Sequence, residues 1–443
     1  MRNLFILILV SCIVCSCAKK LSPEEQIAAQ LKQEITQDLT GNILPFWAKY
    51  APDPAGGFYG TLNYDATPQP DAEKGGILNA RLLWTFSSAY RVLADDSYKI
   101  LADRAQRYFL DYFIDKEYGG SFYTLNADGT PLNMGKVTYQ NAFAIYALSE
   151  HYRATGSEES LQVAIDIYNK FIEYVHDPVN GGFIETFTRD WQMVASAFPK
   201  TMNNNLHVLE ALTNLYRVWK DDGLREILKE QINVMSNKIL DQTTWHERLY
   251  LTMDWEKSRM KVDSYGHDIE FSWLLVEAAE VLGDEAILKD TQRIAVNLAA
   301  TQLEEGIDEK GAVKNEKFDF SGSNFAFTPP PAPAPKDTTK AAAAPTPPPF
   351  GGFEVSYEWW PQAEAVVGFL NAWQISGDKK FLDQAVRSWE WIKAYLIDKE
   401  YGEWYRDVHP DGTPETRRGK ADQWRCPYHN SRMGFEVIAR FPY

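Results

Sequence analysis

The chain has 443 residues, 45% of them apolar and 14% aromatic, which is enough for a large core arranged as one big domain or two. Its formal net charge of −16 argues against nucleic-acid binding, which needs basic patches, so no nucleic-acid partner is expected. Three of the four cysteines lie in the first 17 residues and only Cys426 follows, so no disulfide framework is expected.

The N-terminal segment has the pattern of an export signal. Arg2 precedes an apolar stretch over residues 4–14 that is too short to span a membrane, and a serine and Cys17 follow it. A small residue before a cysteine is typical of bacterial lipoprotein signals, so we predict lipidation at Cys17, with Cys12 as the alternative. Residues 1–22 would form the signal and tether, and the protein would be anchored at the periplasmic face of a bacterial membrane.

A Gly-aromatic turn flanked by acidic and polar residues recurs along the chain. Its copies are AGGFYGTLNYDATP near Gly57, YGGSFYTLNADGTP near Gly120, NGGFIETFTRDWQ near Gly182, HERLYLTMDWE near Arg248, KGAVKNEKFDF near Gly311 and YGEWYRDVHPDGTP near Gly402. The first four steps are 62 to 66 residues long and the last is 91. The last step contains residues 328–350, which include nine prolines and cannot build a core. We therefore predict a mobile Pro/Ala-rich surface insertion over residues 321–353.

Each period has room for two helices of different character. Residues 101–114 and 161–175 are amphipathic, whereas residues 79–93 and 204–219 are apolar around most of their circumference. Six such pairs predict twelve helices, as an open solenoid or a closed ring. The closed ring buries the second class inside the first, so we favour an all-α (α/α)6 barrel over residues 23–443.

The second class of helix carries polar residues near its predicted N-terminus. We place three histidines in similar first-turn settings, in NNNLHVLEAL (His207), SYGHDIEFSW (His267) and CPYHNSRMGF (His429). The other polar residues of this set are Arg81, Gln140, Asn141, Gln362 and Glu364. If the inner helices run parallel, all these side chains converge at one mouth, where helix dipoles favour anionic oxygen and neutral imidazole. This arrangement suits proton transfer and the stabilisation of an enediolate.

Neighbouring residues extend this predicted site. Glu270 lies three residues after His267, so the two share a helical face and Glu270 is expected to orient the imidazole. Trp359 and Trp360 directly precede a predicted helix, where indole rings suit stacking on pyranoses. Beyond the N-terminal leader, no HExxH, CxxC or helical His pair exists, and there is no Gly-rich phosphate loop, so neither a metal nor a nucleotide cofactor is expected.

Four motifs together carry a family resemblance. NNNLHVLEA, GHDIEFSWLL, EWWPQAEAVVGF and WRCPYHNSRMGFEVI, with NARLLWTFSSAYR near the start, closely resemble the cellobiose 2-epimerases of the N-acylglucosamine 2-epimerase superfamily. The similarity runs from about residue 24 to residue 443. It implies an (α/α)6 barrel and reversible epimerisation at C2 of the reducing-end sugar of a β-1,4-linked disaccharide, without a metal or nucleotide. We expect a monomer.

The resemblance also implies roles for single residues. His267 and His429 would be the acid/base pair on the two faces of C2, with Glu270 as the partner of His267. His207 would assist ring opening and hold O1 or O5. Arg81 and Asn203 would hold the enediolate oxygens, and Trp360 and Trp424 would be the sugar platforms.

Other functions stay open at this point. An (α/α)6 glycoside hydrolase would use two carboxylates drawn from Asp268, Glu270 and Glu364, but it would leave the histidines without a task. A lipid-anchored glycan-binding protein would need the aromatic residues alone. Within the family, mannobiose, lactose or an N-acylated monosaccharide could replace cellobiose as substrate. The leader and the Pro/Ala insertion depart from the family pattern, and the insertion bears on substrate size.

Overall fold

The computed structural model describes residues 21–257, 261–319 and 356–442. The predicted lipidation site at Cys17 and the predicted insertion over residues 321–353 lie outside the described residues. Among the described helices, none combines the length and the apolar character that a membrane span requires.

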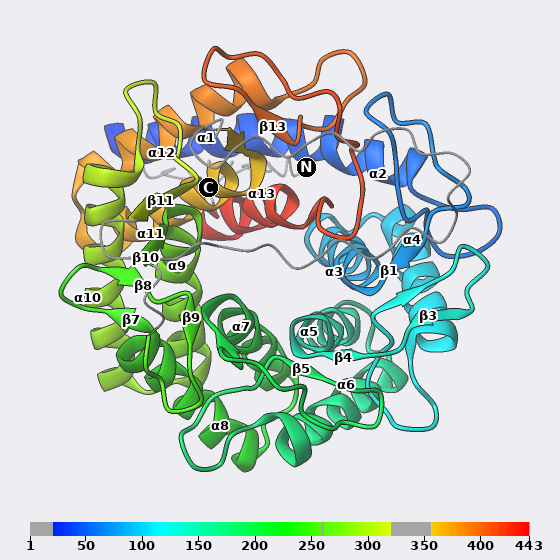
Figure 1. The fold of residues 1–443 in the computed structure, drawn as a ribbon. Coiled ribbons are helices and arrows are strands. Elements are labelled where there is room, and N and C mark those ends of the chain that lie inside the picture. The colour runs from blue at the N-terminus through cyan, green and yellow to red at the C-terminus, as the bar shows by residue number, and fades with distance from the viewer. Residues whose placement is uncertain (1–20, 258–260, 320–355, 443) are drawn as a thin grey trace, which may run out of the picture.

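Six buried helices form a closed inner ring (Figure 1). They are α3 (Gly76–Leu93), α5 (Thr138–Thr155), α7 (Met202–Val218), α9 (Tyr265–Leu282), α11 (Trp359–Ser376) and α13 (Tyr428–Arg440). Each packs on the next, and α13 packs back on α3. These are the helices whose sequences are apolar around most of their circumference, so the predicted (α/α)6 barrel is confirmed.

Amphipathic helices surround the ring (Figure 1), and most of the residues that they bury are apolar. They are α1 (Pro23–Asp38), α4 (Asp96–Tyr108), α6 (Glu158–Lys170), α8 (Asp222–Val234), α10 (Glu285–Thr301) and α12 (Lys379–Trp391). Each ends in a π-helical turn: η1 (Leu39–Ile43), η2 (Phe109–Phe113), η3 (Phe171–Val175), η4 (Met235–Ile239), η5 (Gln302–Gly306) and η6 (Ile392–Leu396). The described chain has thirteen α-helices rather than the expected twelve, because the first outer helix continues past η1 into α2 (Leu44–Tyr50).

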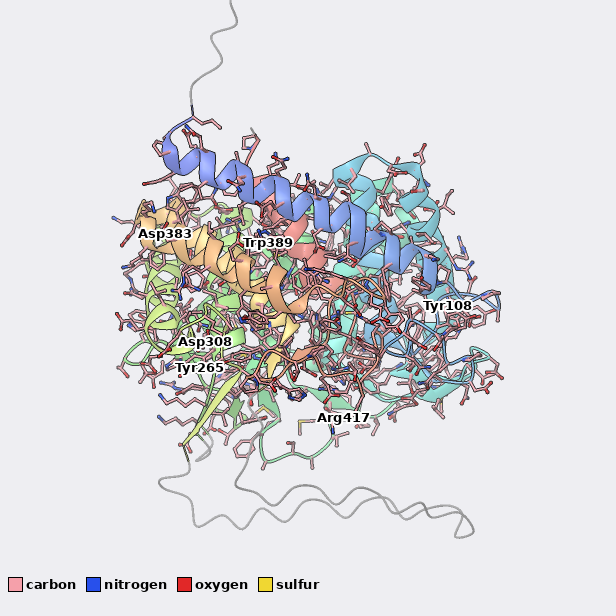
Figure 2. All side chains as sticks on the ribbon, turned by 90° about the horizontal axis from the view of Figure 1, so that it is seen from above. Tyr108, Tyr265, Asp308, Asp383, Trp389 and Arg417 are labelled. Atoms are coloured by element: carbon pink, nitrogen blue, oxygen red, sulfur yellow. The ribbon has the colours of Figure 1, made fainter. Side chains whose placement is uncertain are left out.

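The first and last helices close the ring together. Each inner helix from α3 to α11 is followed by its own outer helix, whereas α13 takes α1 as its outer neighbour. The Lys32 Nζ donates to the carbonyl oxygen of Phe441 at 2.5 Å. The Trp389 indole of α12 donates to Glu34 of α1 at 3.0 Å, and Figure 2 shows α1 running along this side of the barrel. The packing of α1 in the barrel therefore depends on α13, the last inner helix.

Short strands and turns gather at the end of the barrel where the inner helices begin. The strands are β1 (Lys74–Gly75), β2 (Thr124–Leu125), β3 (Pro131–Asn133), β4 (Lys136–Val137), β5 (Thr186–Phe187), β6 (Lys200–Thr201), β7 (Leu240–Asp241), β8 (His246–Glu247), β9 (Tyr250–Leu251), β10 (Lys261–Ser264), β11 (Glu316–Asp319), β12 (Tyr357–Glu358) and β13 (Asp407–Val408). All pairs are antiparallel: β1–β2–β3, β4–β5, β6–β9, β7–β8, β10–β11 and β12–β13. Most of them join the strand that enters one inner helix to the turn of the next repeat.

The recurrent turns explain their glycines and add a repeated ion pair. Gly120 has a φ of +66°, and a Cβ there would lie 2.6 Å from the Trp191 ring. Behind the turns, buried lysines pair with aspartates in four repeats. These pairs are Lys74–Asp53 (2.7 Å), Lys136–Asp115 (2.9 Å), Lys200–Asp177 (2.8 Å) and Lys420–Asp398 (2.7 Å). Each pair fixes a turn against the strand or loop before an inner helix.

Candidate active site

A cavity of about 360 Å³ opens at the end where the inner helices begin. It is lined by Arg81, Tyr139, Asn203, His207, His267, Glu270, Asn315, Glu316, Glu358, Trp359, Trp360, Arg406, Trp424 and His429. All nine side chains assigned above to catalysis or sugar binding are among them. Sequence analysis did not predict that Asn315, Glu316 and Glu358 line the cavity, because these residues reach it only through the pairing of short strands.

The three histidines do not all lie in a first turn. His267 is the third residue of α9 and His429 the second of α13. His207 is the sixth residue of α7, so its predicted first-turn position was wrong. The cause is the cap: the Thr201 hydroxyl accepts from the Asn204 amide at 3.2 Å, and α7 therefore begins at Met202.

His267 is held by a serine rather than by Glu270. Its Nδ1 is 2.7 Å from the Ser264 hydroxyl, which belongs to the residue before α9. The expected Glu270 partnership was therefore wrong, because the Glu270 carboxylate is bonded to Arg432 instead. Burial, with His207 nearby, lowers the pKa of His267 to about 3. The imidazole is thus neutral at pH 7 and can act as a base.

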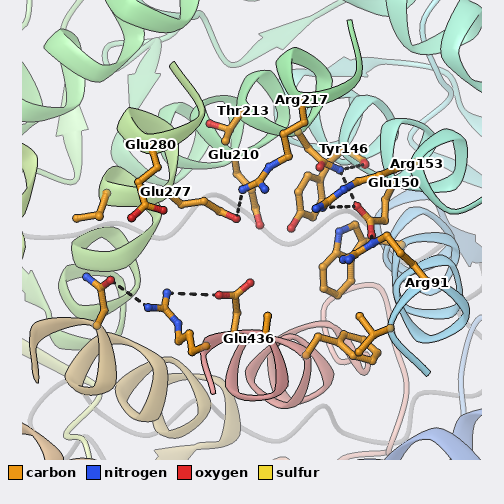
Figure 3. A pocket seen from close by; sticks show the side chains of 18 of the residues that line it. Arg91, Tyr146, Glu150, Arg153, Glu210, Thr213, Arg217, Glu277, Glu280 and Glu436 are labelled. Carbon is orange, nitrogen blue, oxygen red and sulfur yellow. Dashed lines mark hydrogen bonds and ion pairs between the residues drawn. The ribbon is translucent and has the colours of Figure 1, made fainter. Parts of the chain in front are cut away.

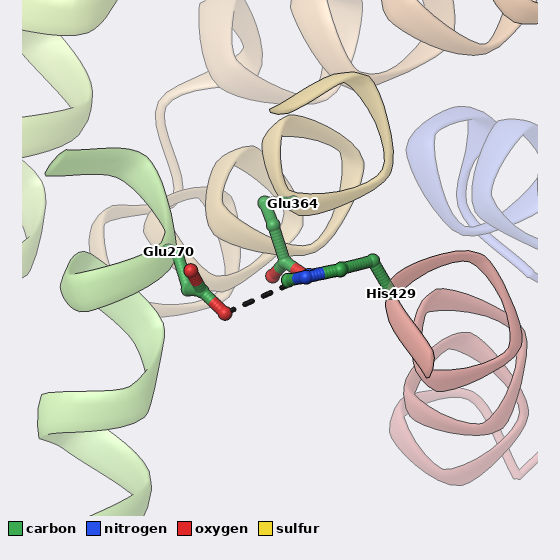
Figure 4. Close-up of side chains that lie close together, drawn as sticks. All are labelled: Glu270, Glu364 and His429. Atoms are coloured by element: carbon green, nitrogen blue, oxygen red, sulfur yellow. Dashed lines mark hydrogen bonds and ion pairs between the residues drawn. The ribbon is translucent and has the colours of Figure 1, made fainter. Parts of the chain in front are cut away.

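His429 has a carboxylate partner from a neighbouring helix. Its Nδ1 lies 2.7 Å from Glu364 Oε1 and 3.7 Å from Glu270 Oε1 (Figure 4). Burial lowers the pKa of His429 well below its usual value, and the positive charges of Arg81 and Arg432 lower it further. A carboxylate bonded to Nδ1 fixes the ring and stabilises an imidazolium when one forms.

His207 has a carboxylate partner on its own helix. Its Nδ1 lies 2.9 Å from Glu210 Oε2, three residues further along α7. Burial raises the pKa of Glu210, but Arg432 and His207 outweigh burial and bring it down to about 2. Glu210 was not predicted as a site residue, although its i+3 spacing from His207 is the same signal that was applied to Glu270.

A buried arginine ties these carboxylates together. Arg432 is 2% exposed, and its Nη1 donates to Glu210 while its Nη2 donates to Glu270 and, at 2.7 Å, to Glu364. Burial lowers the pKa of Arg432, but Glu364 and the other acidic groups raise it well above its usual value. One guanidinium therefore positions the partners of both His207 and His429.

Three carboxylates around one guanidinium leave two of them, Glu270 and Glu364, with raised pKa values. Burial and Glu364 raise the pKa of Glu270, and Arg432 opposes them only in part, so the pKa is about 7. Glu270, Glu364 and His429 also lie close enough together to serve as metal ligands, although the sequence shows no such spacing. Arg432 donates to both of these carboxylates, so the protein itself supplies the positive charge between them.

Arg81 and Asn203 also line the cavity. The Arg81 Nη2 donates to the Tyr139 hydroxyl at 2.7 Å, and its guanidinium lies 4.2 Å from the centre of the Phe143 ring. Aromatic neighbours hold this charge in place without neutralising it. The Asn203 side-chain oxygen has no hydrogen-bond partner among the described residues.

The predicted tryptophans differ in what they can contact. Trp359 is 3% exposed, and Arg425 lies 4.6 Å from its ring centre, so it packs in the wall and is not an open platform. Trp360 contacts both His267 and His429, with ring centroids 4.6 and 5.4 Å apart. Trp424 is 44% exposed at the rim. Trp360 and Trp424 therefore remain the two candidates for stacking on a sugar.

The first-turn amides do not reach the cavity. Gln140 donates to the Ser121 hydroxyl at 2.9 Å, and Asn141 accepts from the Ser121 backbone amide at 2.7 Å. Gln362 accepts from the Val313 amide and donates to its carbonyl oxygen, at 2.8 and 2.9 Å. Their expected convergence with the histidines was wrong, because they hold the Gly-aromatic turns against the inner helices.

Comparisons with known proteins identify the family of this chain. The model of the N-acylglucosamine 2-epimerase (GlcNAc 2-epimerase) family matches residues 57–323 and 352–430. The chain belongs to the N-acylglucosamine 2-epimerase family. It is 40% identical to a cellobiose 2-epimerase from Bacteroides fragilis, with 92% of this chain and 98% of that protein covered. It is 37% identical to a cellobiose 2-epimerase from Ruminococcus albus, with the same two coverages.

A solved structure within the family gives the same result. The cellobiose 2-epimerase from Bacillus thermoamylovorans matches with a TM-score of 0.82 and 34% identity, over 93% of this chain and all of that one (100%). Membership in this family makes the chain a carbohydrate epimerase, which is an isomerase.

Proposed function

We propose that the protein reversibly epimerises C2 of the reducing-end sugar of β-1,4-linked disaccharides, converting cellobiose to 4-O-β-D-glucosyl-D-mannose. The observation that carries this proposal is the pair His267 and His429, which line one cavity and both contact Trp360. Each has its Nδ1 bonded to a neighbouring side chain, so each can turn its other ring nitrogen toward a sugar. The relatives named cellobiose 2-epimerases support the disaccharide as substrate.

The reaction begins by opening the sugar ring. His207, held by Glu210, takes the O1 proton and delivers a proton to O5 as the C1–O5 bond breaks and O1 becomes a carbonyl oxygen. One histidine of the pair then removes the C2 proton. The C–H electrons form a C1=C2 bond, and the carbonyl electrons move to O1.

The enediolate is held and then reprotonated from the other face. Arg81 and Asn203 stabilise the charge on its oxygens. The second histidine takes up a proton and delivers it to C2, the electrons on O1 re-form the carbonyl and the ring closes. Where this histidine is His429, the proton comes from the cluster that it forms with Glu270 and Glu364. The cluster of His429, Glu270 and Glu364 can hold the transferred proton near neutral pH, because the pKa of Glu270 is about 7.

An incubation of the mature protein with cellobiose in D2O tests this proposal, with the sugar followed by NMR and mass. We expect a β-1,4-glucosyl-mannose with one deuterium at C2 and no free glucose. His267→Ala and His429→Ala should each lower kcat by about 10²-fold or more while sugar binding persists. The partly exposed His176→Ala is the matched control and should keep full activity.

Other outcomes would contradict the proposal. Free glucose would identify a glycoside hydrolase. Binding without chemistry on cellobiose, mannobiose and N-acetylglucosamine would identify a glycan-binding protein. Near-full activity in both histidine variants would remove the assigned catalytic pair.

We also propose that the protein is a monomer and that a lipid on Cys17 anchors it at the periplasmic face of a bacterial membrane. The support is the apolar leader that ends in a small residue and Cys17. Metabolic palmitate labelling should be lost in Cys17→Ala. Unchanged labelling in that variant would exclude Cys17 as the lipidation site.

A further inference from the structure

A second cavity lies at the opposite end of the barrel, where the inner helices end. Its volume is about 370 Å³, close to the 360 Å³ of the candidate active site. Figure 3 shows Arg91, Arg153, Arg217, Glu277 and Glu436 around it. None of the residues assigned above to catalysis lines it except Glu210, the partner of His207.

The arginines of this second cavity have local partners. Arg91, Arg153, Arg217 and Arg440 each lie in the last turn of an inner helix, where a cation offsets the negative end of the helix dipole. Each also pairs with a carboxylate of the same wall: Arg91 and Arg153 with Glu150, Arg217 with Glu277, and Arg440 with Glu436. An anionic ligand would therefore have to displace a carboxylate at the negative ends of the helices.

A metal ion does not fit this wall either. Within the described residues, the only three acidic, His or Cys side chains whose ligand atoms converge are Glu270, Glu364 and His429, and these belong to the active site. The charged groups of the second cavity are therefore spread around its wall and do not converge on one point.

Two fully buried donors behind the wall of the second cavity lack acceptors. Asn371 is 4% exposed and lines the cavity, and its Nδ2 has no partner among the described residues. The same holds for the Nε of Arg440. Glu277 and Glu280 provide acceptors on the α9 side, and Trp84 and Phe435 provide an apolar face. A hydroxyl group can both donate and accept, so a polyol can donate to these carboxylates and accept from the arginines that line the cavity.

We propose that this cavity is a second, non-catalytic binding site for a neutral mono- or disaccharide, an inference that rests on the proposed function for the choice of sugar. Glu210 lies between the two cavities and holds His207. Sugar bound at the far end therefore contacts the same carboxylate that positions the residue assigned to ring opening.

Tryptophan indole signals separate the two sites. The full mature His429→Ala protein, labelled with 15N-tryptophan, is titrated with cellobiose; Trp84 reports on the second cavity, and Trp360 and Trp424 report on the active site. We expect Trp84 to shift with its own midpoint. Ala439→Phe, placed at an exposed position that lines the second cavity, should weaken the Trp84 response at least about tenfold and leave Trp360 unchanged. Ala394→Phe, exposed on η6, is the matched control and should change neither.

Each result decides the proposal separately from the epimerase activity. The second site is overturned if the Trp84 signal has not shifted when the Trp360 signal is saturated. It is also overturned if Trp84 shifts with the same midpoint as Trp360 and still does so in Ala439→Phe. A shift caused by glutamate or spermidine but not by cellobiose or glucose overturns the saccharide assignment. Epimerisation is measured in the wild type, so its failure would count against the proposed function and not against this binding result.

Discussion

The two ends of the barrel are built from the same six helices but treat charge in opposite ways. At the far end, arginines in the last turns pair locally with carboxylates that are partly exposed, except for Glu150. At the active-site end, Glu210, Glu270 and Glu364 share one buried guanidinium, that of Arg432. The first arrangement stabilises helix ends, and the second leaves Glu270 with a pKa of about 7. Incomplete charge compensation inside the barrel therefore provides a group that titrates near neutral pH.

The largest difference between the ends should appear on removing an arginine. Arg432→Met leaves three buried carboxylates without their cation, so it should cost about 3–5 kcal/mol of unfolding free energy. It should also lower kcat by about 10²-fold, because His207 and His429 lose their fixed partners. Chemical denaturation and the epimerisation assay measure the two effects.

The matched change at the far end is Arg217→Met. Its side chain and that of Glu277 are each 24% exposed, so the loss should be about 1 kcal/mol or less. Equal destabilisation by the two substitutions would contradict the contrast between the ends.

The dependence of activity on pH should identify Glu270. Its raised pKa means that it holds a proton below about pH 7 and releases it above, so kcat/KM should decline above about pH 7 as the cluster loses the proton that it donates. The measured value belongs to the coupled cluster with Glu364 and His429 rather than to Glu270 alone. In Glu270→Gln the decline near pH 7 should disappear. A decline that persists unchanged would assign it to another group.

The two neighbouring tryptophans should respond differently to substitution. Trp360→Ala removes a ring that contacts both His267 and His429 and should raise KM by about tenfold, the scale of one stacking contact. Trp359→Phe keeps an aromatic ring beside Arg425 and should leave KM unchanged while it lowers thermal stability slightly. Steady-state kinetics on cellobiose distinguish these outcomes. A KM effect confined to Trp359 would reverse the assignment of the platform.

The smallest effects are expected from deleting the predicted insertion and from removing divalent ions. Deleting residues 329–349 should leave the melting temperature within a few degrees, since this segment has too few apolar residues to stabilise an ordered structure of its own.

Activity should also survive incubation with EDTA, because Arg432 already bonds the two carboxylates that would bind a cation. Loss of activity with EDTA and its rescue by a divalent ion would contradict the metal-free mechanism.

The sequence predicted the architecture well because its signals are local. The spacing of Gly57, Gly120 and Gly182 marked the turns, and the apolar character of residues 79–93 and 204–219 marked the inner helices. The partners of the histidines were harder to predict. Glu364 and Arg432 lie on α11 and α13 and meet His429 and Glu270 only through helix packing.

Residues in similar helical positions also proved to have different roles. Asn141 and Asn205 are each the fourth residue of an inner helix and accept from the backbone of a turn. His207 comes two positions after Asn205 and lines the cavity. A helix turns by about 100° for each residue, so a shift of two positions changes whether a side chain faces a turn or the cavity. The sequence could not place the start of α7 accurately enough to separate these two roles.

The pairing of α1 with α13 has a consequence for how the chain folds. The contact between Lys32 and Phe441 joins residues 409 positions apart, and such contacts form slowly because a long loop must close first. The interior pairs, such as α5 with α6, are joined by short loops and can form early. We expect ring closure to be the last step, after the end of the chain has been synthesised. Until α13 has been synthesised and packs against α1, the barrel stays open. This order of folding suits the export proposed above, in which the chain crosses a membrane before it folds.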